Sequence, residues 1–343
     1  MDRASSFPAS RHLPLALTMG DPSGIGPELA LKAWAARQHS DAPFFILGDV
    51  EHLSALAQHL KLDVPCVEVQ PDEALKIFPT ALPVVPLTHR VKGAPGTPDP
   101  ADAAATIQSI EQAVALVKAG DASAIVTNPI AKEVLYASGF KYPGHTEFLG
   151  HLSDVLFGVT AQPVMMLWSP DLAVVPATIH VALSAVPKLL TVDLLLTTTR
   201  IVAQDLRQHF GLANPRIVLT GLNPHAGEGG AMGREEIEII APAIAILRAE
   251  GLNVTGPHPA DTLFHAAKRS TYDVVIAMYH DQALIPLKTL AFDSGVNVTL
   301  GLPFVRTSPD HGTAFDIAGQ GLANPASLIE ALRLAARLTG ERA

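Results

Sequence analysis

Three histidines occupy equivalent places in the sequence. His180, His225 and His280 each come at the end of a short apolar run with the length and composition of a buried strand. The chain has 14 histidines, and a single one is more often a hydrogen-bonded or surface residue than a ligand. Three in matching positions favour a shared role. Neutral imidazoles suit a borderline divalent metal such as zinc, with an open coordination position left for a substrate oxygen.

Two aspartates stand near these histidines in the sequence. Asp281 follows His280 directly, and Asp261 lies in the segment 259–262. Aspartate is a common helix N-cap, so for Asp261 a capping role and a catalytic role fit equally well. For Asp281 the adjacent histidine favours a functional role. Both are therefore candidate catalytic residues.

Five polar residues form a candidate site for an anionic substrate. His145 and Thr146 open a helical segment, where free backbone N–H groups favour phosphate. Lys288, Asn297 and Arg306 stand in otherwise apolar surroundings toward the C-terminus. Lysine binds phosphate as a point charge and arginine as a planar fork of donors. Each charge alone would more often be a solvated surface group, but the set suits a carboxylate and a phosphate.

A glycine-rich segment, 18–28, contains a strand end, a tight turn and a helix start with Pro27 in its first turn. Its backbone N–H groups fit an anion site, and an ordinary strand-to-helix turn fits equally well. The segment matches neither the G-x-G-x-x-G pattern nor the P-loop pattern. It therefore supplies no nucleotide-binding fingerprint.

The elements that must position these residues alternate between strand and helix. Because parallel strands need crossover connections, the alternation predicts an α/β fold with a largely parallel sheet and with sites at the carboxyl ends of the strands. The predicted strands include 13–19, 44–47, 124–127, 164–168, 216–220 and 274–278, and the predicted helices include 27–38, 101–119, 192–210 and 233–250.

Length and composition favour two lobes. The chain has 343 residues and 48% apolar content, which is more than one hydrophobic core usually holds. We expect residues 1–135 and 290–343 to form one α/β lobe and residues 136–289 to form a second lobe that carries much of the metal site. The formal charge of −9 and the scattered Lys and Arg residues argue against a nucleic-acid partner. They leave a small anionic substrate possible.

Cysteine usage and hydropathy indicate a cytoplasmic protein. Cys66 is the only cysteine, which excludes an internal disulfide and a thiolate-rich zinc site. Residues 1–14 lack the apolar core of a signal peptide, and no apolar run approaches the ~20 residues that span a bilayer. We expect neither secretion nor membrane insertion.

Taken together, these segments resemble the 4-hydroxythreonine-4-phosphate dehydrogenase family of pyridoxal phosphate biosynthesis. The resemblance runs from about residue 15 to residue 334. Its most specific parts are the segments 18–28, 142–148, 221–228, 279–282 and 299–314. One departure is the segment 150–162, which is longer than expected and predicts a lengthened helix or loop.

The resemblance implies roles for individual residues. Its metal ligands fall on His180, His225 and His280. The family's substrate contacts fall on the five residues of the candidate anion site: His145, Thr146, Lys288, Asn297 and Arg306. It also implies one divalent ion per subunit (Zn, Mg or Co), NAD or NADP as cofactor, and a homodimer whose active site lies in an interlobe cleft completed by the partner subunit. The implied fold is a two-lobed α/β/α architecture like that of isocitrate and isopropylmalate dehydrogenases, and not a Rossmann dinucleotide fold.

The implied activity is an oxidoreductase reaction. 4-Phosphohydroxy-L-threonine would be oxidised to a β-keto acid, which loses carbon dioxide to give 3-amino-2-oxopropyl phosphate. Three alternatives stay open on the sequence. They are a dehydrogenase of threonate or erythronate 4-phosphate, a metal-dependent hydrolase in which the metal activates water, and a related fold that only binds a phosphorylated ligand.

Overall fold

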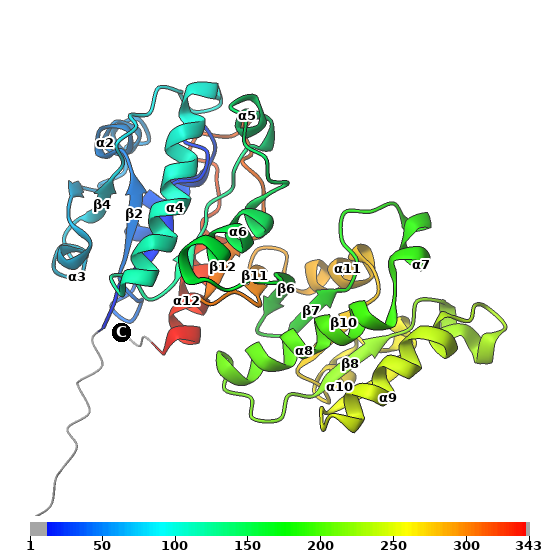
Figure 1. The fold of residues 1–343 in the computed structure, drawn as a ribbon. Helices are drawn as coiled ribbons and strands as arrows, with labels where there is room; N and C mark the ends of the chain where they lie inside the picture. Colours follow the sequence, from blue (N-terminus) through cyan, green and yellow to red (C-terminus); the bar gives the residue numbers. More distant parts are fainter. Residues whose placement is uncertain (1–11, 341–343) are drawn as a thin grey trace, which may run out of the picture.

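A computed structural model describes residues 12–340, so residues 1–11 of the N-terminal segment considered above lie outside it (Figure 1). Within this range a twelve-stranded sheet runs in the order β3-β4-β2-β1-β5-β12-β11-β6-β7-β10-β8-β9. Helices alternate with the strands along the chain, which confirms the predicted α/β class. No helix in the described range is long and apolar enough to cross a membrane.

The first group of strands is entirely parallel and forms one half of the sheet. It consists of β1 (Leu15–Thr18), β2 (Phe44–Gly48), β3 (Cys66–Glu68), β4 (Leu82–Pro86), β5 (Ile125–Val126) and β12 (Arg306–Pro309). The second group is also parallel. It consists of β7 (Leu172–Pro176), β8 (Ile217–Thr220), β9 (Val254–His258) and β10 (Val274–Ala277).

Two strands with antiparallel pairing join the groups. β11 (Val296–Leu300) pairs antiparallel with β12 on one side and with β6 (Val164–Ser169) on the other, and β6 pairs antiparallel with β7. In Figure 1 this junction lies between the blue-to-cyan half and the green-to-yellow half of the molecule. The two halves are therefore connected through the middle of one sheet.

The helices divide between the same two halves (Figure 1). With the first group lie α1 (Gly26–Ala35), α2 (Val50–His59), α3 (Ala74–Ile77), α4 (Ala103–Ala119), α5 (Lys132–Ala137), α6 (His145–Phe157) and α12 (Ala326–Thr339). With the second lie α7 (Val186–Leu189), α8 (Val192–Gln208), α9 (Ala241–Ala249), α10 (Ala266–Arg269) and α11 (His280–Ala291). Of the segment 150–162, residues 150–157 belong to α6, which packs against α4 and ends before the left-handed Gly158, and residues 158–162 lie in the loop that leads to β6.

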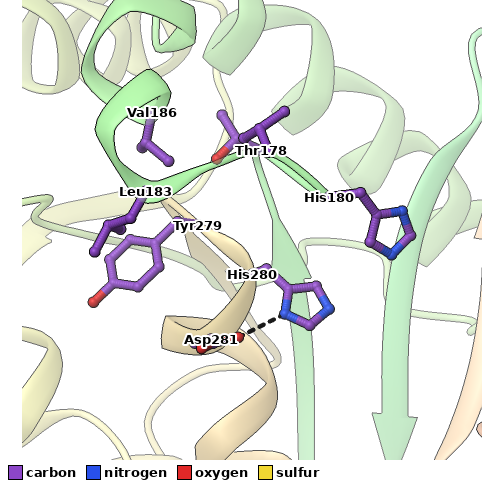
Figure 2. Close-up of a pocket in the computed structure, with 8 residues that line it drawn as sticks. Thr178, His180, Leu183, Val186, Tyr279, His280 and Asp281 are labelled. Atoms are coloured by element: carbon purple, nitrogen blue, oxygen red, sulfur yellow. Dashed lines mark hydrogen bonds and ion pairs between the residues drawn. The ribbon is translucent and has the colours of Figure 1, made fainter.

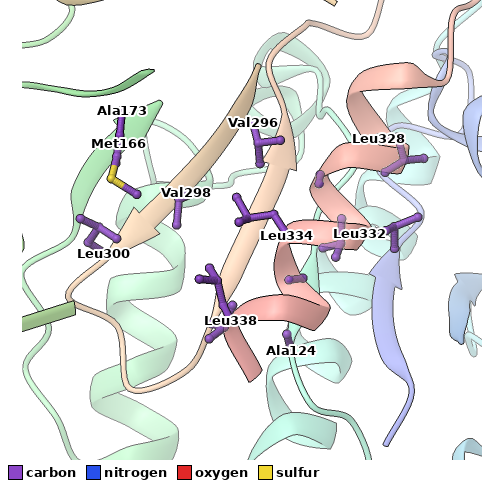
Figure 3. Packing of buried hydrophobic residues seen from close by; sticks show 14 of the residues in the cluster. Ala124, Met166, Ala173, Val296, Val298, Leu300, Leu328, Leu332, Leu334 and Leu338 are labelled. Atoms are coloured by element: carbon purple, nitrogen blue, oxygen red, sulfur yellow. The ribbon is translucent and has the colours of Figure 1, made fainter. Parts of the chain in front are cut away.

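An apolar cluster holds the junction together (Figure 3). Met166 of β6, Val298 of β11 and Leu334 of α12 are all at most 2% exposed and belong to one contiguous core. α12 packs along both β11 and β12. Because close-packed interiors resist deformation, this cluster sets how the ends of the two strand groups face each other.

The glycine-rich turn at residues 20–26 is a buried structural turn. Its N–H groups bond within the protein: the amide of Gly24 donates to the carbonyl oxygen of Asp21, and that of Ile25 donates to Thr313. Gly20 has φ +73°, and a Cβ there would lie 2.6 Å from the carbonyl oxygen of Pro129. The anion-site interpretation of this segment is not supported, because its donors already have partners.

A buried carboxylate joins α1 to the segment before α12. Glu28 is fully buried and accepts hydrogen bonds from the backbone amides of Gly319 and Ala323, at 3.1 and 3.2 Å. Lys32, one turn later, forms an ion pair with it at 2.7 Å. Three donors would lose this acceptor if the carboxylate were removed.

We predict that Glu28→Ala lowers the free energy of unfolding by about 3 kcal/mol, because it leaves buried donors and a cation unpaired. Urea unfolding of the full chain measures this loss. The control is Glu51→Ala, whose side chain is 78% exposed and forms one ion pair, with Arg90 at 3.4 Å. It should change stability by less than about 0.5 kcal/mol. Equal stability of the two variants would contradict the structural role of Glu28.

Candidate active site

A cavity of about 480 Å³ opens where the strand ends of the two groups meet. This volume suits a small metabolite. Residues after β5 and β12 form one side, and residues after β7 and β10 form the other. Its polar lining includes Thr127, Asn128, Lys132, His145, Thr146, His180, His280, Asn297, Arg306, Asp310 and His311.

The cavity gathers six of the ten sequence-predicted site residues: His145, Thr146, His180, His280, Asn297 and Arg306. Lys288 reaches it indirectly, because its Nζ pairs with the lining residue Asp310 at 2.7 Å. Asp281 lines an adjoining pocket with His180 and His280. His225 and Asp261 line neither of these two spaces.

Arg306 is a buried cation that pairs with no anion among residues 12–340. It is 4% exposed, and its guanidinium donates to the hydroxyl oxygens of Thr127 and Thr299. Burial lowers the pKa of Arg306 to about 10, so the group stays charged at neutral pH. A buried charge normally has a counter-charge, because removal from water is costly. The free face of this guanidinium is therefore a strong site for an anion.

The start of α6 adds to the same end of the cavity. Gly144 is the N-cap and has no side chain to satisfy the first amides, so His145 and Thr146 stand at a helix terminus open to a ligand. Burial, with the positive charges of Arg306 and Lys132, holds the pKa of His145 well below its usual value. Its buried Nε2 has no partner in the described structure. The arrangement favours a dianion such as phosphate.

Two imidazoles mark the other side of the cavity. The ring centroids of His180 and His280 lie 5.7 Å apart (Figure 2). His180 lies in the loop after β7, and His280 is the first residue of α11, which follows the neighbouring strand β10. The Nδ1 of His280 lies 2.8 Å from Oδ1 of Asp281. If Nδ1 carries the proton and donates to this carboxylate, Nε2 keeps a lone pair for a metal.

His225 belongs to a different part of the second half. It follows β8, the strand beside β10, but lies exposed in the loop Pro224–Gly230. That segment lies beside the short helix Ala260–Thr262, which carries the exposed Asp261. No group of three or more His, Cys, Asp or Glu side chains within residues 12–340 of one chain is arranged to hold a metal ion. A single chain therefore brings His180 and His280 together at the cavity and holds His225 outside it.

Several polar residues of the cavity lining were not among the predicted site residues, including Thr127, Asn128, Lys132, Asp310 and His311. Two of them, Asn128 and His311, carry polar atoms that lack a partner among the described residues. Oδ1 of Asn128 and Nε2 of His311 are buried without a hydrogen-bond partner in the described structure. The Nδ1 of His311 lies 3.0 Å from the carbonyl oxygen of Gly312, which can only accept, so Nε2 carries the lone pair of the neutral ring. Burial is the main cause that lowers the pKa of His311. Both residues lie in segments already notable for polar composition, but their missing partners are visible only in three dimensions.

Comparison with known proteins decides the family. Residues 39–335 match the family described as pyridoxal phosphate biosynthetic protein PdxA. The chain is 62% identical over 333 residues to a 4-hydroxythreonine-4-phosphate dehydrogenase of Methylorubrum extorquens, with 96% of this chain and 95% of the relative covered. The chain belongs to the PdxA family.

Solved structures agree with this membership. A 4-hydroxythreonine-4-phosphate dehydrogenase from Klebsiella pneumoniae superposes with a TM-score of 0.84 at 38% identity, covering 95% of this chain and 99% of the other. A terephthalate 1,2-cis-dihydrodiol dehydrogenase from Burkholderia xenovorans superposes at 0.64 with 32% identity, covering 96% and 99%. The PdxA fold is thus shared with a dehydrogenase named for another substrate, which makes the chemistry of the cavity important.

We predict that Arg306→Met weakens binding of a phosphorylated ligand without destabilising the fold. Losing a charge-assisted hydrogen bond costs about 1.5–3 kcal/mol, which is roughly a 10- to 150-fold loss of affinity. Removing an unpaired buried charge should leave the melting temperature unchanged or raised. Calorimetric titration with inorganic phosphate and thermal unfolding measure the two effects.

The matched control is Arg333→Met, because Arg333 is a surface arginine paired with Asp41 and Glu330. It should leave phosphate affinity unchanged. Wild-type phosphate affinity in Arg306→Met would show that the buried guanidinium is not the anion site.

Proposed function

We propose that this protein oxidises 4-phosphohydroxy-L-threonine with NAD or NADP, in the biosynthesis of pyridoxal phosphate. The β-keto acid formed would lose carbon dioxide and yield 3-amino-2-oxopropyl phosphate. The observation that carries this proposal is one cavity with an unpaired buried guanidinium at one end and a pair of imidazoles at the other. Membership of the PdxA family supports the same reaction.

The phosphate would bind at the Arg306 end. Arg306 supplies an unpaired charge, and the start of α6 supplies amides together with His145 and Thr146. Asn297, on β11, lines the same cavity and supplies an uncharged amide. Lys288 is already neutralised by Asp310, so we assign it to the carboxylate end of the substrate, where a weaker attraction suffices.

We propose that His180 and His280 bind one divalent ion (Zn, Mg or Co), together with His225 of the partner subunit. The two rings fit this role, because they are neighbours and Asp281 lies where it can fix the tautomer of His280. Such an ion supplies Lewis acidity that favours loss of the alcohol proton. The exposure of His225, away from the cavity of its own chain, is the reason for proposing a homodimer with shared sites.

The chain offers a proton acceptor in His311. The residue lines the cavity, and its Nε2 carries a lone pair and lacks a partner in the described structure, so we propose that it takes the proton of the substrate alcohol as hydride leaves for the cofactor. Asp281 is then an orienting group for His280. Asp261 lies beside the segment of His225, so any part it plays would come together with that residue from the partner subunit.

Initial rates of nicotinamide reduction at 340 nm test the proposed substrate. We expect rapid reduction with 4-phosphohydroxy-L-threonine and at least about 10-fold lower kcat/KM with threonate or erythronate 4-phosphate. All three compounds carry the phosphate that Arg306 would bind, but only 4-phosphohydroxy-L-threonine carries an amino group. Higher kcat/KM for a sugar-acid phosphate would reassign the substrate. Release of inorganic phosphate without nicotinamide reduction would indicate a hydrolase, and binding with no turnover a binding protein.

Complementation tests the shared site. Inactive His225→Ala protein and inactive His280→Ala protein are mixed and allowed to exchange subunits. If the ligands come from different chains, one site of each heterodimer carries both substitutions and the other is intact, so up to half of the heterodimer's activity should return. Subunit exchange shown by native mass spectrometry without recovered activity would contradict the shared site and leave the dehydrogenase proposal standing.

A further inference from the structure

The segment that carries His225 has an unusual backbone. Five consecutive residues, 225–229, lie in the left-handed region, with φ between +44° and +80°. Three of them, His225, Ala226 and Glu228, are not glycine. L side chains rarely adopt this conformation, and a run of them persists only where the surroundings impose it.

The side chain of Glu236 holds the residues just before this run. Its carboxylate is buried, with the residue 3% exposed, and Oε1 accepts the backbone amides of Leu222 and Asn223, both at 2.8 Å. Oε2 accepts from Nδ2 of Asn223 at 3.0 Å. These donors come immediately before the left-handed run. The amide of Ala226 in turn donates to the carbonyl oxygen of Asn223.

The loop closes tightly around this carboxylate. A Cβ on Gly227 would lie 2.6 Å from Oε2 of Glu236, and one on Gly221 would lie 3.0 Å from Oε1. Glu236 opens a single π-helical turn, Glu236–Ile240, a feature often found at functional sites. No lysine, arginine or histidine within residues 12–340 forms an ion pair with Glu236. Its charge is directed to the N–H groups of the loop.

We propose that Glu236 is the positioning residue for His225: it holds the left-handed loop so that the imidazole projects outward, ready to enter the cavity of a partner subunit. This inference rests on the proposed function of His225 as a metal ligand. A flexible loop would present the imidazole in many orientations and would lose entropy on binding the ion. Because the carboxylate of Glu236 already orders the loop before the ion binds, this loss of entropy is smaller.

The test compares Glu236→Gln with Glu238→Gln in the full-length protein. Glutamine retains one acceptor oxygen but places an NH₂ group against the donors of the loop. Glu238 lies on the same turn, is 58% exposed and pairs with Arg234, so its substitution is a matched control. Cobalt(II) affinity is read from the visible absorption of the bound ion, with His225→Ala as the reference for loss of the ligand.

We expect cobalt(II) affinity to fall at least about 10-fold in Glu236→Gln and to stay unchanged in Glu238→Gln. In the proposed reaction kcat should fall while KM for the phosphorylated substrate changes little, because the Arg306 end is untouched. A variant that merely loosens the fold would lower both the affinity and the urea midpoint. Asn223→Ala removes the hydrogen bonds that Nδ2 donates to Oε2 of Glu236 and to Oε2 of Glu235, at 3.0 and 2.8 Å, and should give a smaller loss of affinity at a wild-type midpoint.

Two results would overturn the inference in distinguishable ways. Wild-type cobalt(II) affinity in both Glu236→Gln and Asn223→Ala, with the affinity lost in His225→Ala, would remove the positioning role and leave the proposed metal site intact. Full affinity in His225→Ala would remove the ligand role of His225, and the positioning role would fall with it. If Glu236→Gln does not fold, Asn223→Ala decides the outcome, with Glu235→Gln as the control for the second hydrogen bond of Asn223.

Discussion

The active site depends on a positive charge that the protein buries without an anion of its own. Arg306 is 4% exposed and is held by the hydroxyls of Thr127, directly after β5, and Thr299, on β11; these are the two strands beside β12. Hydroxyl groups fix the orientation of the guanidinium but leave its charge unbalanced. Under the proposed function, binding of the substrate phosphate would supply the missing counter-charge and would favour phosphate over neutral groups. Burial, together with the charge of Arg306, holds the pKa of the neighbouring His145 well below its usual value.

The anion end and the imidazole end of the cavity lie on different halves of the molecule. Arg306 belongs to the first strand group, whereas His180 and His280 follow strands of the second. Their separation therefore depends on the junction formed by β6, β11 and α12 and on its apolar cluster (Figure 3). A rigid junction keeps both ends of a short substrate in register. The packing of the junction core thus fixes the separation between Arg306 and the two histidines.

The alternation of strands and helices was predictable from the sequence because β1, β2, β6, β8 and β10 are short apolar runs between turn residues. β12 was not, because its sequence Arg-Thr-Ser-Pro is polar and is nevertheless buried in the middle of the sheet. Most of the predicted site residues do share one cavity. The left-handed loop at His225 has no distinct signal beyond its glycines, since the buried carboxylate that holds the preceding residues, Glu236, is brought to them only by folding. The partnerless atoms of Asn128 and His311 are likewise properties of the folded chain alone.

The central claim is that the unpaired charge of Arg306 receives the phosphate of the substrate. A crystal structure of the protein with 4-phosphohydroxy-L-threonine tests it most directly. The account predicts the phosphorus peak beside the Arg306 guanidinium and the start of α6, with phosphate oxygens about 2.7–2.9 Å from its nitrogens. A carboxylate at Arg306 with the phosphate at the His180 and His280 side, or a phosphate bound outside this cavity, would contradict it.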